Sequence, residues 1–291
     1  MTAPSALRLM WFVPPPVVVV VSALGLVSAD TFTAVRNSSS DEQFEALAAG
    51  AIDLVVTAMD NVIAWNRRAG PADFCIVAQI ERTTPLHLIA RPDVKTLADV
   101  RERTVLVDAP GNGFVIALRA LLADAGLDAD SYALRQAGGV KERFDALLVG
   151  EGHCTLLGPP FDTMALSAGM VQLATVQERY PAFPGQGLVM RREAIERLRG
   201  PVSGWLQGIE AASRSFTTDA PAVRLALLDA GFPEAAVPAM VLMLPRSLWP
   251  DREGLELIIQ HQQQLGLAGG DERYDSLVET SLLPSSTGVI A

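Results

Sequence analysis

Polar and glycine-rich loops interrupt this 291-residue chain at places where side chains could bind a small molecule. Five stretches stand out: FVPPP at 12–16, NSSSDE at 37–42, TAMDN at 57–61, APGNGF at 109–114 and GPPFD at 158–162. Four of them follow an apolar, strand-like segment, at the end where open α/β sheets bind ligands. The second, fourth and fifth open helices, whose first backbone N–H groups favour anions. These helix starts carry no Lys or Arg, so they predict a site in which backbone and hydroxyl donors hold one carboxylate, sulfonate or phosphate.

Residue types in these loops suggest individual roles. Trp11, Phe114 and Phe161 are expected to form apolar walls, and Asn61 to bind a polar edge of the ligand. Simpler structural roles stay open, because Asp60-Asn61 also suits a turn with a helix cap, and Pro159-Pro160 suits a stiff turn. The candidate ligand-binding residues are Trp11, Pro14, Ser39, Ser40, Thr57, Asp60, Asn61, Gly111, Asn112, Gly113, Phe114, Gly158, Pro159 and Phe161.

Catalytic chemistry has weaker support in the sequence. Cys154, Glu81 and Asp60 are the candidates, because each falls near a predicted cleft loop. His153 directly precedes Cys154, and neighbours on a strand point to opposite faces, so the two do not form a thiol–imidazole pair within the strand. Cys75 and Cys154 lie in apolar runs, which predicts buried free thiols.

No cofactor or metal is expected. Ile116 stands where a dinucleotide-binding loop that begins at Gly111 needs glycine or alanine. The three histidines are far apart in the sequence, and no Cys or His pair has the spacing of zinc ligands.

Composition narrows the possible partners. The formal net charge is −10 and the sequence pI is about 4.8, which argues against nucleic acid and anionic membranes as partners. Hydrophobic residues make up 49% of the chain and charged residues 19%, as in a globular protein. A small-molecule ligand, no membrane insertion, and a monomer or weak dimer are therefore expected.

Alternating strand-like and helix-like segments predict an α/β fold with mainly parallel strands. From residue 191 to about 266 the chain is expected to be mostly helical, and no internal repeat is seen. The predicted strands are 7–13, 51–58, 74–80, 85–91, 104–109, 154–158 and 187–190. The predicted helices are 41–50, 93–100, 113–126, 141–150 and 162–169.

The N-terminal stretch WFVPPPVVVVVSALGLVSAD at 11–30 has two interpretations. It is apolar and ends in small residues, as an export signal does. Three consecutive prolines interrupt it, however, and only Arg8 precedes it as a positive charge. Proline breaks a helical signal core, and the uninterrupted run is too short to cross a membrane, so folded protein is favoured. The five valines alone favour a strand, although tertiary context overrides such a preference.

Three segments, in order, resemble one known family. SSSDEQFEALAAGAIDLVVTAMDNVIAWN, VDAPGNGFVIALRALLADAGL and LLGPPFDTMALSAG are similar to type II periplasmic substrate-binding proteins. The closest branch is that of ABC-transporter binding proteins for sulfonates, nitrate-like anions and thiamine-pyrimidine precursors. The resemblance covers about residues 7 to 215, and none of its motifs is a catalytic signature.

The resemblance implies a two-lobed α/β fold, with the ligand in a cleft between lobes that two crossover strands join. It implies a first strand at 7–12, a cleft loop at 13–16 and a first helix at 17–26. The contact positions of the first lobe are matched by Ser39, Ser40, Thr57 and Asn61. Those of the second lobe are matched by the loops at 111–114 and 158–161. The implied divisions are 1–90 and 187–282 for the first lobe, 91–186 for the second, and 283–291 for a loose tail.

The resemblance implies the function of an ABC-transporter solute-binding protein that binds a small anionic or aromatic organic molecule and has a permease as its partner. Two features depart from the family: no export signal is recognised, and His153-Cys154 stands where an acidic and a small residue are expected. Of these, the missing signal favours a cytoplasmic location, with a periplasmic one as the alternative if the native precursor carries an export signal. They also keep open a cytoplasmic enzyme on the same fold: a decarboxylase, lyase or isomerase of a small carboxylate, or a relative of thiamine-pyrimidine or menaquinone synthesis.

Overall fold

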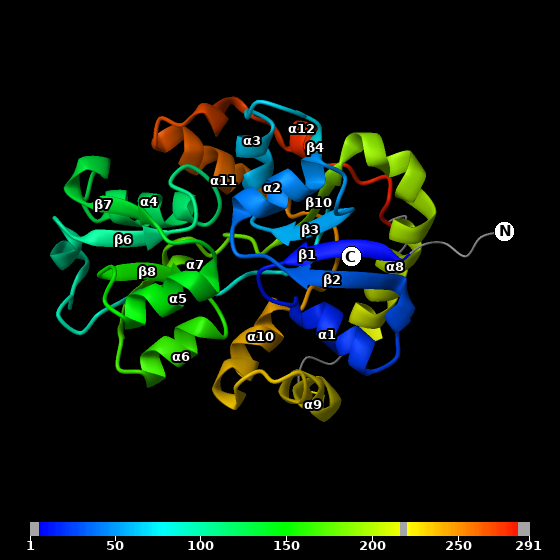
Figure 1. Cartoon of the computed structure of the whole chain (residues 1–291), viewed down its shortest axis with the longest axis horizontal. Coiled ribbons are helices and arrows are strands. Elements are labelled where there is room, and N and C mark those ends of the chain that lie inside the picture. Colours follow the sequence, from blue (N-terminus) through cyan, green and yellow to red (C-terminus); the bar gives the residue numbers. More distant parts are fainter. Residues whose placement is uncertain (1–5, 216–219, 285–291) are drawn as a thin grey trace.

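Two five-stranded sheets form the centres of two lobes in the computed structural model, which describes residues 6–215 and 220–284 (Figure 1). The strand order is β2-β1-β3-β10-β4 in the first sheet and β7-β6-β8-β5-β9 in the second, which confirms the predicted α/β fold. The first sheet contains β1 (Leu7–Trp11), β2 (Phe32–Arg36), β3 (Leu54–Thr57), β4 (Phe74–Gln79) and β10 (Gly187–Arg191). The second contains β5 (His87–Ala90), β6 (Thr104–Val107), β7 (Ala133–Gln136), β8 (Cys154–Leu157) and β9 (Val171–Thr175).

The two sheets repeat one topology. In each sheet, three parallel strands come from consecutive β-α units, and the next strand, β10 or β5, runs antiparallel to its neighbours. The segments after β4 and before β10 connect the lobes, so two crossovers pass between the sheets. No repeat is recognisable in the sequence, because the two sheets match in the order of their elements and in a few positions rather than in long identical stretches.

Helices pack on both faces of the sheets. The first lobe contains α1 (Pro16–Ala23), α2 (Ser40–Ala48) and α3 (Asn61–Trp65). The second contains α4 (Val115–Asp124), α5 (Val140–Leu148), α6 (Phe161–Ser167) and α7 (Val176–Arg179). The helical last third contains α8 (Ile195–Ser215), α9 (Pro221–Asp229), α10 (Val237–Met243), α11 (Arg252–Gln264) and α12 (Tyr274–Leu277).

The valine run forms a helix. Pro16 occupies the first turn of α1, where a backbone N–H would have no partner within the helix. Val17, Val18, Val20 and Val21 are buried in the core that α1 forms with α8, α9 and α10, so burial overrides the strand preference of valine. None of the helices within the described ranges is long and apolar enough to cross a bilayer.

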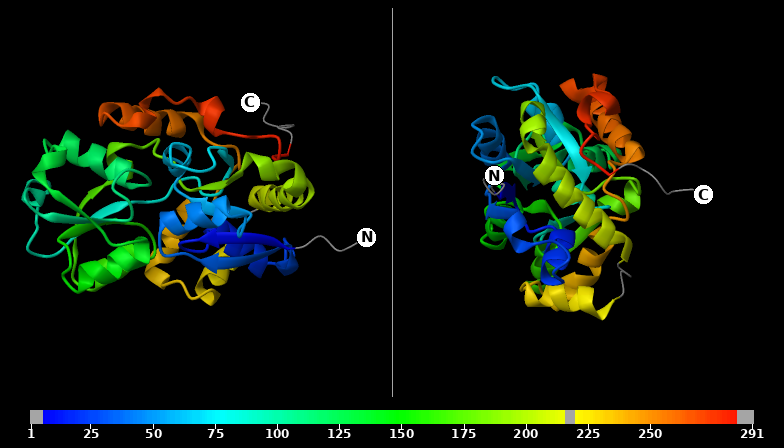
Figure 2. Two further views of the ribbon diagram at one scale, coloured as in Figure 1. Left: turned by 45° about the horizontal axis from the view of Figure 1, so that its top comes forward. Right: turned by 90° about the vertical axis from the view of Figure 1, so that its right-hand side faces the viewer.

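Lobe boundaries at residues 90, 186 and 282 remain a prediction. The sheet order places β5 with the second sheet, although this strand precedes residue 91. The C-terminal helical region does not pack on the first sheet alone, because the orange α11 reaches over to α4 (Figure 2). Of the predicted tail, residues 285–291 lie outside the described part of the chain.

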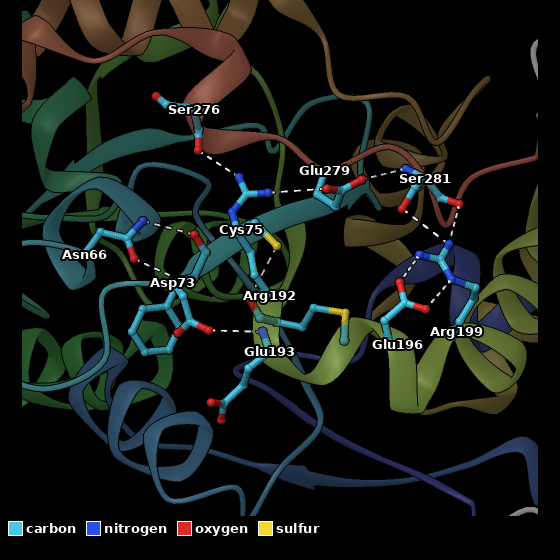
Figure 3. Close-up of polar contacts among 12 residues, drawn as sticks. Asn66, Asp73, Cys75, Arg192, Glu193, Glu196, Arg199, Ser276, Glu279 and Ser281 are labelled. Carbon is cyan, nitrogen blue, oxygen red and sulfur yellow. Dashed lines mark hydrogen bonds and ion pairs between the residues drawn. The ribbon is translucent and has the colours of Figure 1, made fainter.

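Polar contacts fasten the last described segment to the first lobe. Val278 pairs with Ile76 of β4, and the backbone N–H of Glu279 donates to the carbonyl of Ile76 at 2.9 Å. The guanidinium group of Arg192 donates to the Ser276 carbonyl at 2.8 Å and lies 3.4 Å from the Glu279 carboxylate (Figure 3). The end of the described chain is therefore held by both β4 and the short segment between β10 and α8.

Candidate functional site

A cavity of about 90 Å³, partly open to solvent, lies where strand ends of both sheets meet. The loops after β1, β3, β6 and β8 line it, together with both crossover segments and parts of α4, α5 and α10. Eight of the predicted ligand-binding residues line it, three from the first lobe and five from the second. They are Pro14, Thr57 and Asn61, and Asn112, Gly113, Phe114, Gly158 and Pro159.

Asn61 connects the two walls of the cavity. Its Nδ2 donates to Thr57 Oγ1 at 2.6 Å, and its Oδ1 accepts from Nδ2 of Asn112, across the cavity, at 2.6 Å. Gly113 follows with φ +77°, a left-handed conformation that glycine adopts readily, and a Cβ there would lie 3.3 Å from Asn61 Oδ1. In this structure the side chain of Asn61, which was expected to bind a polar edge of the ligand, therefore joins the two lobes.

Further contacts close the lobes against each other. The backbone N–H of Gly139, at the start of α5, donates to the carbonyl of Ser38 at 2.6 Å. An ion pair at 2.5 Å joins Arg36 of β2 to Glu142 of α5. These contacts hold the two lobes against each other beside the cavity.

The expected anion site at the start of α2 is already occupied. The Ser39 hydroxyl caps the helix by accepting from the backbone N–H of Glu42 at 3.2 Å. The backbone N–H of Ser40 donates to Oδ2 of Asp108, from the second lobe, at 3.0 Å. Ser39, Ser40 and the predicted Gly111 are absent from the cavity lining. Two backbone donors of this helix start, those of Ser40 and Glu42, are thus satisfied within the protein.

Two predicted aromatic walls do not line the cavity, because Trp11 is buried in the core and Phe161 packs against a separate buried cluster from a partly buried position. Trp11 ends β1 and packs on Phe32, with ring centroids 5.9 Å apart, because it shares the sheet face that packs on α1 and α8. Phe161 packs on Phe144 at 5.4 Å. Phe12, one residue after Trp11, lines the cavity in its place. The sequence identified the right loops but assigned two side chains to the wrong side.

Cys154 is placed unfavourably for catalysis. It is fully buried in β8 and does not line the cavity, and burial raises the pKa of its thiol to about 12. A thiolate nucleophile is therefore disfavoured at neutral pH. Asp60 is also buried outside the lining, and burial raises the pKa of its carboxyl to about 7.

Glu81 lies at the junction of the two crossovers and lines the cavity. Its carboxyl accepts from the Thr84 hydroxyl at 2.5 Å and from Nε2 of Gln186, on the other crossover, at 3.1 Å. Burial raises the pKa of Glu81 to about 7, although both hydrogen bonds oppose that rise. A carboxyl group that titrates near neutral pH therefore lies between the connecting segments.

Arg143 of α5 and Asp108 of the loop after β6 are charged lining residues that were not predicted from the sequence. Arg143 stands in KERFDALL, where a charged residue is expected on the solvent face of an amphipathic helix. A signal was present in the matching helix α2, whose fourth residue, Gln43, is a buried polar residue. Within the described residues, no group of three or more His, Cys, Asp or Glu side chains could hold a metal ion.

Known proteins match this chain in structure and not in sequence. No protein-family profile matches it, and no curated protein sequence does. The alkanesulfonate-binding protein SsuA from Xanthomonas axonopodis pv. citri bound to MOPS has a TM-score of 0.72 at 17% identity, over 92% of this chain and 95% of that chain. The zinc-bound ligand-binding component of an ABC-type import system from Staphylococcus aureus has a TM-score of 0.76 at 13% identity, over 96% and 97%. The periplasmic nitrate-binding protein NrtA from Synechocystis PCC 6803 has a TM-score of 0.75 at 12% identity, over 94% and 84%.

The chain has the type II periplasmic-binding-protein fold. This confirms the fold that the three sequence segments implied, including the two crossovers and the cleft loop after β1. It also corrects the expected compartment. Proteins that share the periplasmic-binding-protein fold with this chain include periplasmic ones, so the cytoplasmic assignment is wrong. That assignment depended on the start of the chain, which does not decide a compartment.

Proposed function

We propose that this protein binds one small organic molecule, anionic or aromatic, between its lobes and delivers it to the permease of an ABC import system. The observation that carries the proposal is the convergence of strand-end loops from two sheets on one cavity, at the place where open α/β sheets bind ligands. The ABC-transport component of the proposal is supported by the kinds of protein that share this fold.

The chemistry of the cavity suits an organic molecule. Phe12, Leu118, Met240 and Met243 provide apolar surface, and a few polar groups such as Gln186 lie among them. Apolar walls with a small number of placed polar groups are typical of small-molecule sites. The contacts between the lobes would then enclose the bound molecule.

An enzyme on this fold is the less favoured alternative. The proposed nucleophile Cys154 has a raised pKa and lies outside the cavity, and Asp60 lies outside it as well. Glu81 is the remaining candidate, but Thr84 and Gln186 already bind both of its oxygens.

One incubation distinguishes the two functions. Purified protein is mixed with a small-molecule extract of cells, and mass spectrometry follows both the protein-bound and the free molecules. We expect one compound to stay bound unchanged, near one per chain. Consumption of a compound in many-fold excess over protein, with a matching product mass, would replace binding by catalysis.

A further inference from the structure

Arg143 occupies the same place in the second lobe as Gln43 does in the first. Each is the fourth residue of its helix, α5 or α2, and each donates to the carbonyl of the third residue of the following strand. Gln43 Nε2 lies 3.0 Å from the Val56 oxygen, and Arg143 Nη2 lies 3.2 Å from the Leu156 oxygen. The structural task at this position is therefore one that a neutral amide performs, and a positive charge is not needed for it.

The surroundings of Arg143 leave its charge without a contacting anion. Nε donates to the Thr155 hydroxyl at 3.1 Å, and Nη1 to the Gly138 carbonyl at 2.9 Å. These partners and Leu156 are all neutral, and Arg143 forms no ion pair with any carboxylate of the described residues. Burial lowers the pKa of the guanidinium group, and the nearby charges of Asp108 and Glu142 oppose that change only in part. A buried cation of this kind is stabilised by a bound anion.

The other charged groups of the cavity are already engaged. The Asp108 carboxyl accepts from the backbone N–H of Ser40, at the start of α2, and the Glu81 carboxyl accepts from Thr84 and Gln186. The helix start of α2 therefore has its donor satisfied by Asp108. Arg143 is the cationic side chain that lines the cavity among the described residues.

We infer that Arg143 binds the anionic group of the ligand, a carboxylate, sulfonate or phosphate, in place of the helix start of α2. A guanidinium group has five N–H donors, and three of them are used within the lobe. One N–H remains on each terminal nitrogen, which suits two oxygens of one oxyanion. This inference rests on the proposed binding function and adds the ligand class and the residue that selects it.

The test repeats the extract incubation with matched variants. Arg143→Gln installs the residue that the first lobe uses at this position, so the contact to Leu156 is kept while the charge is lost. Arg143→Lys keeps the charge, and Arg135→Gln removes an exposed arginine of the same lobe that pairs with Glu151. Bound compounds are identified by mass, and the amount retained per chain is measured over a dilution series of protein.

We expect the unaltered protein and R135Q to retain a compound with a carboxylate, sulfonate or phosphate group. R143Q should bind it about 10- to 100-fold more weakly, because a charge-assisted hydrogen bond is lost, and R143K should fall between. A retained neutral compound, or equal affinity in R143Q, would overturn the role of Arg143 and leave the binding function standing. Retention of nothing by the unaltered protein would overturn the binding function itself, and this inference with it.

Discussion

Helices α2 and α5 occupy matching places in the two lobes, but the fourth residue of each has a different role. In α2 the buried amide of Gln43 donates to the Asn37 side chain and to the Val56 carbonyl, both at 3.0 Å. In α5 the matching Arg143 reaches the cavity and keeps a charge there without a contacting anion. The helix starts also differ, since Ser39 caps α2 with its hydroxyl and Gly139 precedes α5 without a side chain.

The difference between Gln43 and Arg143 indicates that matching positions in the two lobes serve stability in one lobe and ligand binding in the other. Gln43 is neutral, and its amide nitrogen makes two hydrogen bonds in the core, although its Oε1 has no partner. A group retained for binding is allowed to be charged and incompletely compensated, which lowers stability until a ligand arrives. Substitutions at Gln43 and at Arg143 can therefore be compared directly, each as a control for the other.

The largest effect is expected at Gln43. Substituting Gln43→Leu leaves the Asn37 side chain and the Val56 carbonyl without their partner in the core, so the free energy of unfolding should fall by about 2–4 kcal/mol. Arg143→Gln should change it by less than about 1 kcal/mol, because the contact to Leu156 is kept and a buried charge is removed. Urea denaturation monitored by circular dichroism measures both variants.

Equal losses of unfolding free energy in the two variants would contradict this expectation, because Arg143 would then matter as much for stability as Gln43. A gain of unfolding free energy in R143Q would support it further. The matching result in binding, a loss of affinity in R143Q alone, comes from the extract incubation.

Glu81, another ionisable group of the cavity, is also expected to lower stability, in a way that depends on pH. Burial raises the pKa of Glu81 from 4.5 to about 7, so the folded state holds its proton more tightly than the unfolded chain does. Stability from this group is greatest below pH 4.5 and is lost as pH rises toward 7, by about 3 kcal/mol in all. Glu81→Gln removes that loss, so the variant should gain about 2 kcal/mol more at pH 8 than at pH 5 relative to the unaltered protein.

Denaturation curves of both proteins at the two pH values measure this difference. The Thr84 hydroxyl can accept as well as donate, so an amide at position 81 can still be bonded on both sides. A gain of the same size at pH 5 and pH 8 would show that the ionisation of Glu81 is not what lowers stability.

The sequence predicted the parts of the site that backbone position decides. A loop at the end of a parallel strand faces the cleft whatever its side chains are, so FVPPP, TAMDN, APGNGF and GPPFD all reach the cavity. The central strands were found for a related reason, because they are buried on both faces and read as continuous apolar runs.

What the sequence missed depends on side-chain direction and on partners far along the chain. Trp11 lies one residue before the loop and points into the core, while Phe12 points into the cavity. Asp108 occupies the α2 start, 68 residues away in the chain, and no local pattern indicates that contact. The edge strands β2 and β7 were also missed, because their side chains are mostly exposed and show no apolar run.

The smallest effect is expected at Gly139, where the two helix starts meet. A Cβ at this position would lie 2.6 Å from the Phe12 ring of the other lobe, although the backbone of Gly139, with φ −62°, accepts any residue. Gly139→Ala should therefore disfavour the closed form by about 1–2 kcal/mol, while within its own lobe only the end of the flexible Glu142 side chain has to move. Small-angle scattering should show a larger radius of gyration, with little change in the melting temperature.

Gly111→Ala is the matched control, because a Cβ at Gly111, in the same lobe, meets no atom within 4 Å. Its scattering curve should equal that of the unaltered protein. If G139A is as compact as G111A, Phe12 has turned aside without opening the lobes. Glycine at the start of α5 would then reflect tight local packing, and the contrast with the hydroxyl-capped start of α2 would carry no consequence for closure.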